Sequence, residues 1–477
     1  MIDKYIEKNI VRQVKVIEYL FELKQIDTQQ VADLLGVSRM TIKRDIERIL
    51  LLDSRIQLVE EKGVHTTINF WPEATRYELI KKVYNQSYFL KVCYLYLSGE
   101  RNYLKISERE HTSVAKVFSV KKKVAEFFKK VGVMTEDGRF EEDEFKHRLI
   151  TLTIWMRIDF FQAMIDRRIL VNAKKIVDQL MKLFSNELNS REKHFLTLNV
   201  YMALKRNGRN LNFPERVKYV YRKEIYIKIR KLLSNYHLND NEINYLTFMY
   251  NLLNHNLTNY YYLEIEYFQI RKRAMQEYPE LIELIHQFEL TFQRDLAKEP
   301  LFEKALWRFL VSLSYNRAML LVEKNHFITE IQRNFCNKVK ALIIEWSQKN
   351  NYVIFLTQSS VETFCLQVQD LLIQNDMTRI WHIFIVAEDE FSHIVYREWM
   401  NRRLNPENMT IDQSLYYSLD QLPAYIDSSS SIIICERSLT SFPFDEYQGV
   451  KLFPTSLVSV DEDLQHLVDY LFYRYNK

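Results

Sequence analysis

Residues 27–52, DTQQVADLLGVSRMTIKRDIERILLL, decide the fold at the start of this chain. Asp27 belongs to the residue types that cap helices, and apolar residues recur at helical spacing as far as Leu35. Gly36 follows, and a residue without Cβ can adopt the positive φ of a tight turn without steric cost. Ser38 can cap a second helix that has isoleucine at every third or fourth position. The stretch therefore predicts a helix-turn-helix.

The second helix of this stretch has a polar, cationic side opposite its isoleucines. Such a helix fits the major groove of DNA, where Arg can bind guanine through two hydrogen bonds and Lys binds phosphate as a point charge. The alternative is an ordinary helical hairpin with a solvated basic face. The residues predicted to contact DNA on this helix are Ser38, Arg39, Thr41, Lys43 and Arg44.

Two flanking patterns favour the DNA-binding interpretation. Apolar residues at helical spacing predict a helix over residues 11–23, and two apolar runs separated by Glu-Lys-Gly predict a β-hairpin after the second helix. Together these elements make a winged helix, which we expect over residues 1–70. Its wing would hold Lys62 and His65 near a phosphate backbone or a minor groove.

The composition describes a large and mostly helical chain. Its 477 residues exceed the usual size of a single core and predict several domains. A hydrophobic content of 47% excludes general disorder, and only 7 Gly and 8 Pro favour helices with short connections. The first residues do not resemble a signal peptide, and no apolar run reaches the ~18 residues of a membrane span. We therefore expect a cytoplasmic protein that makes no membrane contact.

No pattern typical of catalysis or of a cofactor site occurs. The 4 Cys residues lack the spacing of a zinc or redox site, and glycine-rich phosphate loops and hydrolase motifs are absent. We expect no enzyme activity, no cofactor and no metal. Residues 380–477 hold 7 Lys or Arg against 15 Asp or Glu, so this acidic end is not expected to bind nucleic acid.

A second helix-turn-helix is predicted inside residues 71–160, in SEREHTSVAKVFSVKKKVAEFFKKVGV (residues 107–133). Its first helix is expected over about residues 108–117, with Ser119 and Val120 in the turn. Adjacent lysines on the second helix repel one another, which favours an anionic partner. The alternative is a solvated lysine face. The lysines predicted to contact DNA phosphates are Lys121, Lys122 and Lys123.

The rest of the chain divides into a helical part and an α/β part. Residues 192–253 and 302–373 are similar in layout, which predicts two all-α bundles over residues 161–262 and 263–378. Residues 379–477 alternate strands with helices and predict a small, mostly parallel α/β domain. The strands are expected at 381–387, 428–436 and 450–460, and the helices at 391–403 and 461–473. The fold class is thus mainly α and multidomain.

This layout resembles the Mga/AtxA family of global and virulence regulators of low-GC Gram-positive bacteria. The resemblance covers essentially the whole chain. It implies that the helical bundles are phosphotransferase-system regulation domains (PRDs) and that the last domain is similar to the enzyme IIB of sugar phosphotransferase systems. It also implies a homodimer that binds promoter double-stranded DNA, responds to carbohydrate status and interacts with phosphotransferase-system proteins.

The chain departs from this family at the phosphorylation sites. PRDs are typically phosphorylated on histidine, but the matching positions here hold Asn199, Met249 and Leu310. The IIB-like loop, AEDEFSH (residues 387–393), lacks the cysteine nucleophile of an active enzyme IIB, and Cys435 is expected in the core. The alternative phosphoacceptors nearby are His194, His237, His255 and His326.

The sequence therefore predicts a DNA-binding transcription regulator. Two other functions stay open at this point. One is a phosphosignalling protein that acts through protein–protein contacts. The other is an RNA-binding PRD antiterminator, although proteins of that class begin with a β-rich domain and this chain begins with helices.

Overall fold

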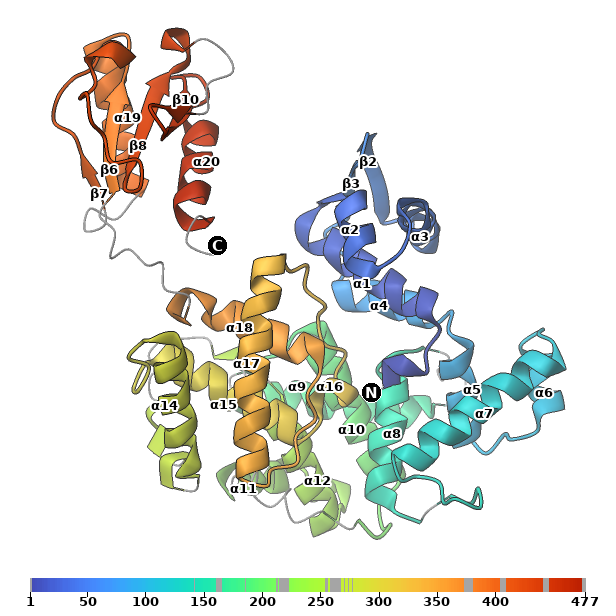
Figure 1. Cartoon of the computed structure of the whole chain (residues 1–477). Coiled ribbons are helices and arrows are strands. Elements are labelled where there is room, and N and C mark those ends of the chain that lie inside the picture. The colour runs from blue at the N-terminus through green and yellow to red at the C-terminus, as the bar shows by residue number, and fades with distance from the viewer. Residues whose placement is uncertain are drawn as a thin grey trace. The chain divides into compact units, whose positions relative to one another are not determined.

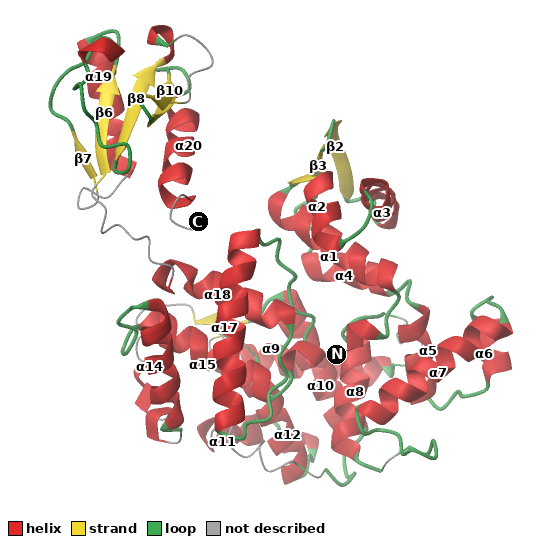
Figure 2. Cartoon of the chain, in the orientation of Figure 1, coloured by secondary structure: helices red, strands yellow, loops and turns green. Residues whose placement is uncertain are grey.

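The computed structural model describes a mostly helical chain with strands near its two ends and one short strand pair between them (Figure 2). Two compact units, Met1–Val368 and Gln369–Lys477, are described separately below. Among the described residues, no helix has both the length and the apolar character needed to cross a membrane. The described residues are 2–140, 142–159, 165–184, 186–211, 213, 223–253, 256–257, 267–269, 271–272, 274–276, 278–372, 381–403, 409–440 and 446–473.

The first unit begins with a helix-turn-helix and a β-hairpin (Figure 1). The hairpin strands pair antiparallel, and a short strand before the second helix, which the sequence did not predict, completes a sheet in the order β1-β3-β2. The helix, the helix-turn-helix and the hairpin expected from the sequence are confirmed. Their bounds are η1 (Ile2–Lys4), α1 (Lys8–Leu23), β1 (Gln25–Asp27), α2 (Thr28–Leu35), α3 (Arg39–Leu52), β2 (Ile56–Lys62) and β3 (His65–Phe70).

Five helices follow the hairpin, and one predicted turn among them is wrong. Ser119 and Val120 lie inside a continuous helix, and the turn before it falls at residues 110–113. His111 supplies the left-handed backbone there (φ 47°), and Ser113 caps the next helix through the backbone N–H of Lys116. The helices are α4 (Arg76–Tyr84), α5 (Tyr88–Leu97), α6 (Tyr103–Arg109), α7 (Val114–Lys130) and α8 (Glu144–Trp155).

The described remainder of the first unit is mostly helical, with loops such as residues 322–329 and one short strand pair. The bounds up to that pair are α9 (Arg167–Phe184), β4 (Asn186–Glu187), α10 (Ser190–Lys205), α11 (Lys223–Leu232), η4 (Ser234–Tyr236), α12 (Asp240–Asn251) and β5 (Asn256–Leu257). After it come α14 (Glu280–Phe292), α15 (Pro300–Ser314), α16 (Arg317–Leu320), α17 (Glu330–Lys349) and α18 (Gln358–Leu372). The duplication of two bundles and their domain limits stay predictions.

A buried ion network joins α8 to α10 and α12. Arg148 is completely buried, and its guanidinium donates to both carboxylate oxygens of Glu242, at 2.6 and 2.8 Å. It also donates to Glu144 at 2.8 Å, and Glu144 in turn accepts two hydrogen bonds of 2.6 Å from Arg206. Because every charge has an opposite partner with short hydrogen bonds, the network can lie in the interior at an acceptable free energy.

The segment 322–329, between α16 and α17, packs against α1. The buried carboxylate of Glu18 on α1 accepts hydrogen bonds from Arg76 at 2.5 Å and from the backbone N–H of Asn325 at 2.9 Å. The ring of Tyr19 meets Phe327 edge-on, with the centroids 5.5 Å apart. Burial raises the pKa of Glu18 despite these donors. The first helix of the winged helix is therefore packed against a segment some 300 residues later.

The second unit is a five-stranded sheet in the order β7-β6-β8-β10-β9, with β9 as its one antiparallel strand among the described residues. This confirms the mostly parallel sheet. The third predicted strand was expected to reach residue 460 but ends at Thr455, because Ser456 and Ser459 hydrogen-bond Asp463 at the start of α20. The bounds are β6 (Trp381–Val386), α19 (Glu390–Arg403), β7 (Met409–Ile411), η6 (Leu419–Gln421), β8 (Ser431–Glu436), η7 (Arg437–Leu439), β9 (Glu446–Tyr447), β10 (Val450–Thr455) and α20 (Val460–Tyr473).

Candidate DNA-binding surface

The predicted recognition helix α3 is positioned by caps and by its buried face. Asp27 accepts hydrogen bonds from the backbone N–H groups of Gln29 and Gln30, at 2.7 and 3.0 Å, and so caps α2. Gly36 takes φ 64° in the turn, and Ser38 accepts from the N–H of Thr41 at 3.3 Å to cap α3. The buried residues of α3 include the three predicted isoleucines, Ile42, Ile46 and Ile49.

A buried carboxylate fixes α3 against α1, which sequence reasoning missed. Asp45 is only 1% exposed and accepts hydrogen bonds from Arg12 at 2.5 Å and from Gln13 at 2.9 Å. A charged residue between isoleucines on the same helix face was a signal for such a partner, since isolated carboxylates are rarely buried. These contacts restrict the rotation of α3 about its axis and determine which side chains it presents to solvent.

Arg39 connects the recognition helix to the wing. Its side chain donates to the hydroxyl of Thr28 at 3.1 Å and to the backbone carbonyl of Gly63 at the tip of the hairpin. Thr28 donates its own hydroxyl to the carbonyl of Val64 at 2.7 Å. Arg39 was predicted to contact DNA, and here it is half-buried and bound within the protein. It can still act by holding the wing beside α3.

The wing itself has little positive charge. Lys43 on α3 forms an ion pair with Glu61 on β2, so its charge is partly neutralised. Glu60 is a second exposed carboxylate on this strand. Lys62 and His65 are both exposed, as the sequence analysis expected of groups that approach DNA. Phosphate contacts by the wing would therefore depend on these two side chains.

The exposed stripe of α3 contains the predicted Arg44 and two residues, Met40 and Arg48, that the sequence analysis did not single out. Arg44 and Arg48 are exposed one turn apart, and neither has an ion-pair partner among the described residues. Met40 is 57% exposed one turn before Arg44. Counting every fourth residue from Met40 would have found this stripe. The two arginines are the side chains on α3 best placed to reach base edges or phosphates.

The three lysines of α7 lie in the middle of that helix. Lys122 and Lys123 are exposed, while Lys121 is half-buried and its ammonium lies 3.5 Å from the carbonyl of Arg101. They follow the turn at residues 110–113 by two to three helical turns. Side chains at such a distance from the start of a recognition helix suit phosphate contacts better than base contacts.

Comparison with known proteins supports this surface. Residues 12–50 match the family model of the DeoR-like helix-turn-helix domain. The match spans most of α1, all of α2 and nearly all of α3, and it supports a DNA-binding transcription regulator. A search of curated proteins found no match for the chain.

The positions that the family resemblance aligns with PRD phosphorylation sites are buried. Asn199 is completely buried, donates to the carbonyl of Phe195 at 2.8 Å and accepts from the hydroxyl of Tyr245 at 2.5 Å. Met249 and Leu310 are buried as well. The structure thus gives these three residues packing contacts.

The alternative histidines lie in different environments. His237 is exposed, at the end of η4, whereas His255 lies outside the described residues. His326 is half-buried, with Nε2 3.0 Å from the hydroxyl of Thr363. The ring of His194 is half-buried, and its Nε2 is buried without a hydrogen bond from the described residues. No two of the described histidines share a cluster of metal-binding groups within the described part of the chain.

Acid should destabilise the chain through two half-buried histidines, His326 and His147. Burial is the main cause that lowers the pKa of His326 to about 4 and that of His147 to about 4. Between roughly pH 4 and pH 6.5 the unfolded state binds protons that the folded state does not, so the free energy of unfolding falls as the pH falls. We expect His326→Gln to flatten this dependence and His237→Gln to leave it unchanged, in urea unfolding followed by circular dichroism. An identical slope for both variants would contradict the assignment.

The loop after β6 contains no cysteine. Asp389 uses its carboxylate to accept from the N–H groups of Phe391 and Ser392, at 2.8 and 3.0 Å, at the start of α19. Cys435 on β8 is fully buried, and burial together with Glu436 raises the pKa of its thiol to about 12. This confirms that Cys435 belongs to the core.

All 4 cysteines should resist alkylation in the native protein, because each is buried. Intact-mass spectrometry after iodoacetamide treatment should show no adduct under native conditions and four adducts in denaturant. Rapid native labelling of Cys435 would show an accessible thiolate and would restore the enzyme IIB interpretation.

Proposed function

We propose that this protein is a DNA-binding transcription regulator of the Mga/AtxA type, which acts in the cytoplasm on promoter DNA. The observation that supports this proposal best is the exposed pair Arg44 and Arg48 on a helix that Asp45 holds in place. The exposed lysines of α7 support a second contact with the phosphate backbone. The proposal includes a homodimer and no enzyme activity.

Regulation by carbohydrate status is the less supported half of the proposal. The described PRD-matching positions hold buried side chains, so a phosphoryl signal would have to use another residue. His237 is the exposed candidate among the described histidines. Incubation with phosphoenolpyruvate and the general phosphotransferase proteins, followed by mass spectrometry, would detect a phosphohistidine. If no adduct forms, regulation through a phosphohistidine and the phosphosignalling alternative are both excluded.

Genome-wide footprinting on the protein's own chromosome tests the main proposal. We expect enrichment at promoters, and binding to the best sites should weaken with rising salt as phosphate contacts are lost. Equal affinity for unrelated DNA sequences, or preferential recovery of RNA, would contradict a promoter-binding regulator. A fragment from the strongest site then serves for the quantitative measurements described below.

A further inference from the structure

A large cleft lies in the first unit beside the winged helix. Its free volume is about 900 Å³, which is within the range of volumes found for small-molecule sites. Residues from three places line it: Arg55, between α3 and β2; Lys81 and Lys82 on α4; and positions on α9 and α10 that include Lys174 and His194. Figure 1 shows α9 and α10 side by side in the green part of the chain.

The lining of this cleft has an excess of positive charge. Six Lys or Arg side chains face three carboxylates, a difference of three charges. Four of the six cations are paired. Lys193 lies 2.8 Å from Asp178, and Lys81 forms an ion pair with Asp159. Arg55 and Lys82 both pair with Asp53, which lies outside the lining, at 2.8 and 2.7 Å. Arg167 and Lys174 have no ion-pair partner within the described part of the chain. These two side chains are available for an anion.

His194 adds an unpaired polar group to the same cleft. Its hydrogen bond to the backbone of Trp155 leaves Nε2 buried and without a partner among the described residues. Burial, followed by the charge of Lys81, lowers the pKa of His194 to about 3. The ring is therefore neutral, and because its other nitrogen donates to the Trp155 carbonyl, Nε2 is a hydrogen-bond acceptor. Such an atom favours a ligand hydroxyl or N–H group.

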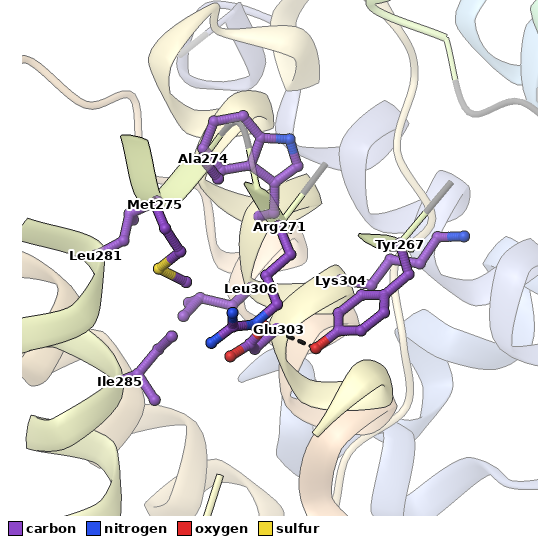
Figure 3. A pocket seen from close by; sticks show the side chains of 10 residues that line it. Tyr267, Arg271, Ala274, Met275, Leu281, Ile285, Glu303, Lys304 and Leu306 are labelled. Atoms are coloured by element: carbon purple, nitrogen blue, oxygen red, sulfur yellow. Dashed lines mark hydrogen bonds and ion pairs between the residues drawn. The ribbon is translucent and has the colours of Figure 1, made fainter. Parts of the chain in front are cut away.

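A smaller pocket near Glu303 provides a useful contrast (Figure 3). Its free volume is about 20 Å³, room for no more than a water molecule. Glu303 already accepts hydrogen bonds from Tyr267 and Arg271, each at 2.8 Å, so its carboxylate is satisfied inside the protein. The cleft beside the winged helix differs in having both space and unsatisfied groups.

We propose that this cleft binds a small phosphate ester that also carries hydroxyl groups, the chemistry of a sugar phosphate. Arg167 and Lys174 neutralise the phosphoryl group, and His194 accepts a hydrogen bond from a hydroxyl. Apolar side chains such as Ile165 and Leu170 line the remaining wall. Because the lining comes from α4 and from α9 and α10, a bound ligand stabilises the packing between the two groups of helices.

Calorimetric titration of the full chain tests this site with glucose 6-phosphate, glycerol 3-phosphate, glucose and inorganic phosphate. We expect both esters to bind, inorganic phosphate to bind more weakly and glucose not to bind. Arg167→Ala with Lys174→Ala should weaken ester binding roughly tenfold or more, since two charge-assisted contacts are lost. Lys175→Ala is the matched control on α9, because Lys175 is exposed outside the cleft lining, and it should leave binding unchanged.

His194→Phe separates the hydroxyl contact from the charge. It should remove the preference for the esters over inorganic phosphate, with little change in phosphate affinity. Circular dichroism establishes that each variant is folded. Failure of both esters to bind overturns the proposal, as does unchanged binding in the double variant. Loss of DNA affinity in that variant, without any ester binding, would assign the cleft to the DNA surface instead.

Discussion

Arg44→Ala combined with Arg48→Ala should nearly abolish binding to the footprinted promoter fragment. Each arginine that binds a base edge contributes about 1–3 kcal/mol, so the pair should account for a loss of about thirtyfold or more. Both side chains are exposed and have no ion-pair partner among the described residues, so their removal should leave the fold intact. Fluorescence anisotropy at fixed salt, with unfolding curves for each variant, measures both effects.

The matched control for this variant is Lys231→Ala, which removes an exposed cation at the end of α11. It should change DNA affinity by less than about twofold. Arg39→Ala would test DNA contact less well than the double variant. Removal of the Arg39 side chain also breaks the hydrogen bonds that hold the tip of the wing beside α3. Unchanged affinity after removal of Arg44 and Arg48 would exclude α3 as the recognition helix.

Arg148→Met should produce the largest loss of stability. The substitution leaves Glu242 buried without either of its two guanidinium donors, and breaking a buried ion pair in this way costs about 3–5 kcal/mol. Glu144 keeps its contacts with Arg206. Burial already raises the pKa of Glu242, so the carboxyl group should fold in its protonated form in the variant. Urea unfolding at pH 7 and pH 5 measures the loss and its partial recovery in acid.

A second variant distinguishes lost pairing from lost packing. Arg148→Met with Glu242→Leu removes both charges, and replacement of a buried pair by apolar groups is often close to neutral. It should therefore be more stable than Arg148→Met alone. Lys146→Ala, on an exposed position of the same helix, should change stability by less than about 0.5 kcal/mol. A double variant that is no more stable than the single one would show that shape, not charge, holds α8 in place.

The sequence alone predicted the winged helix, because the residues that mark the ends of its helices and its turn act on close neighbours in the chain. Asp27 and Ser38 cap within three residues, and Gly36 is the residue type that its φ requires. The turn predicted for the second helix-turn-helix was misplaced, because the observed turn uses His111 at a positive φ, where composition gives no warning. Ser113 was the available signal, since its residue type and position suit a helix cap.

The candidate surface was only partly predictable, since the decisive contacts are tertiary. The carbonyl that Arg39 binds lies 24 residues along the chain, and the partners of Asp45 lie more than 30 residues away. A helical wheel cannot show that Arg39 turns toward the wing while Arg48 faces solvent. The cleft beside the winged helix likewise brings together residues from 55 to 198.

The packing of α1 against the segment 322–329 has a consequence during synthesis. Glu18 obtains its hydrogen bond from Asn325 only after the ribosome has added the 307 residues that follow Glu18, up to and including Asn325. At about 5–20 residues per second that interval lasts roughly 15–60 s. Throughout it, a nascent chain lacks the contacts that Asn325 and Phe327 make with Glu18 and Tyr19, so the packing of α1 is completed late in synthesis.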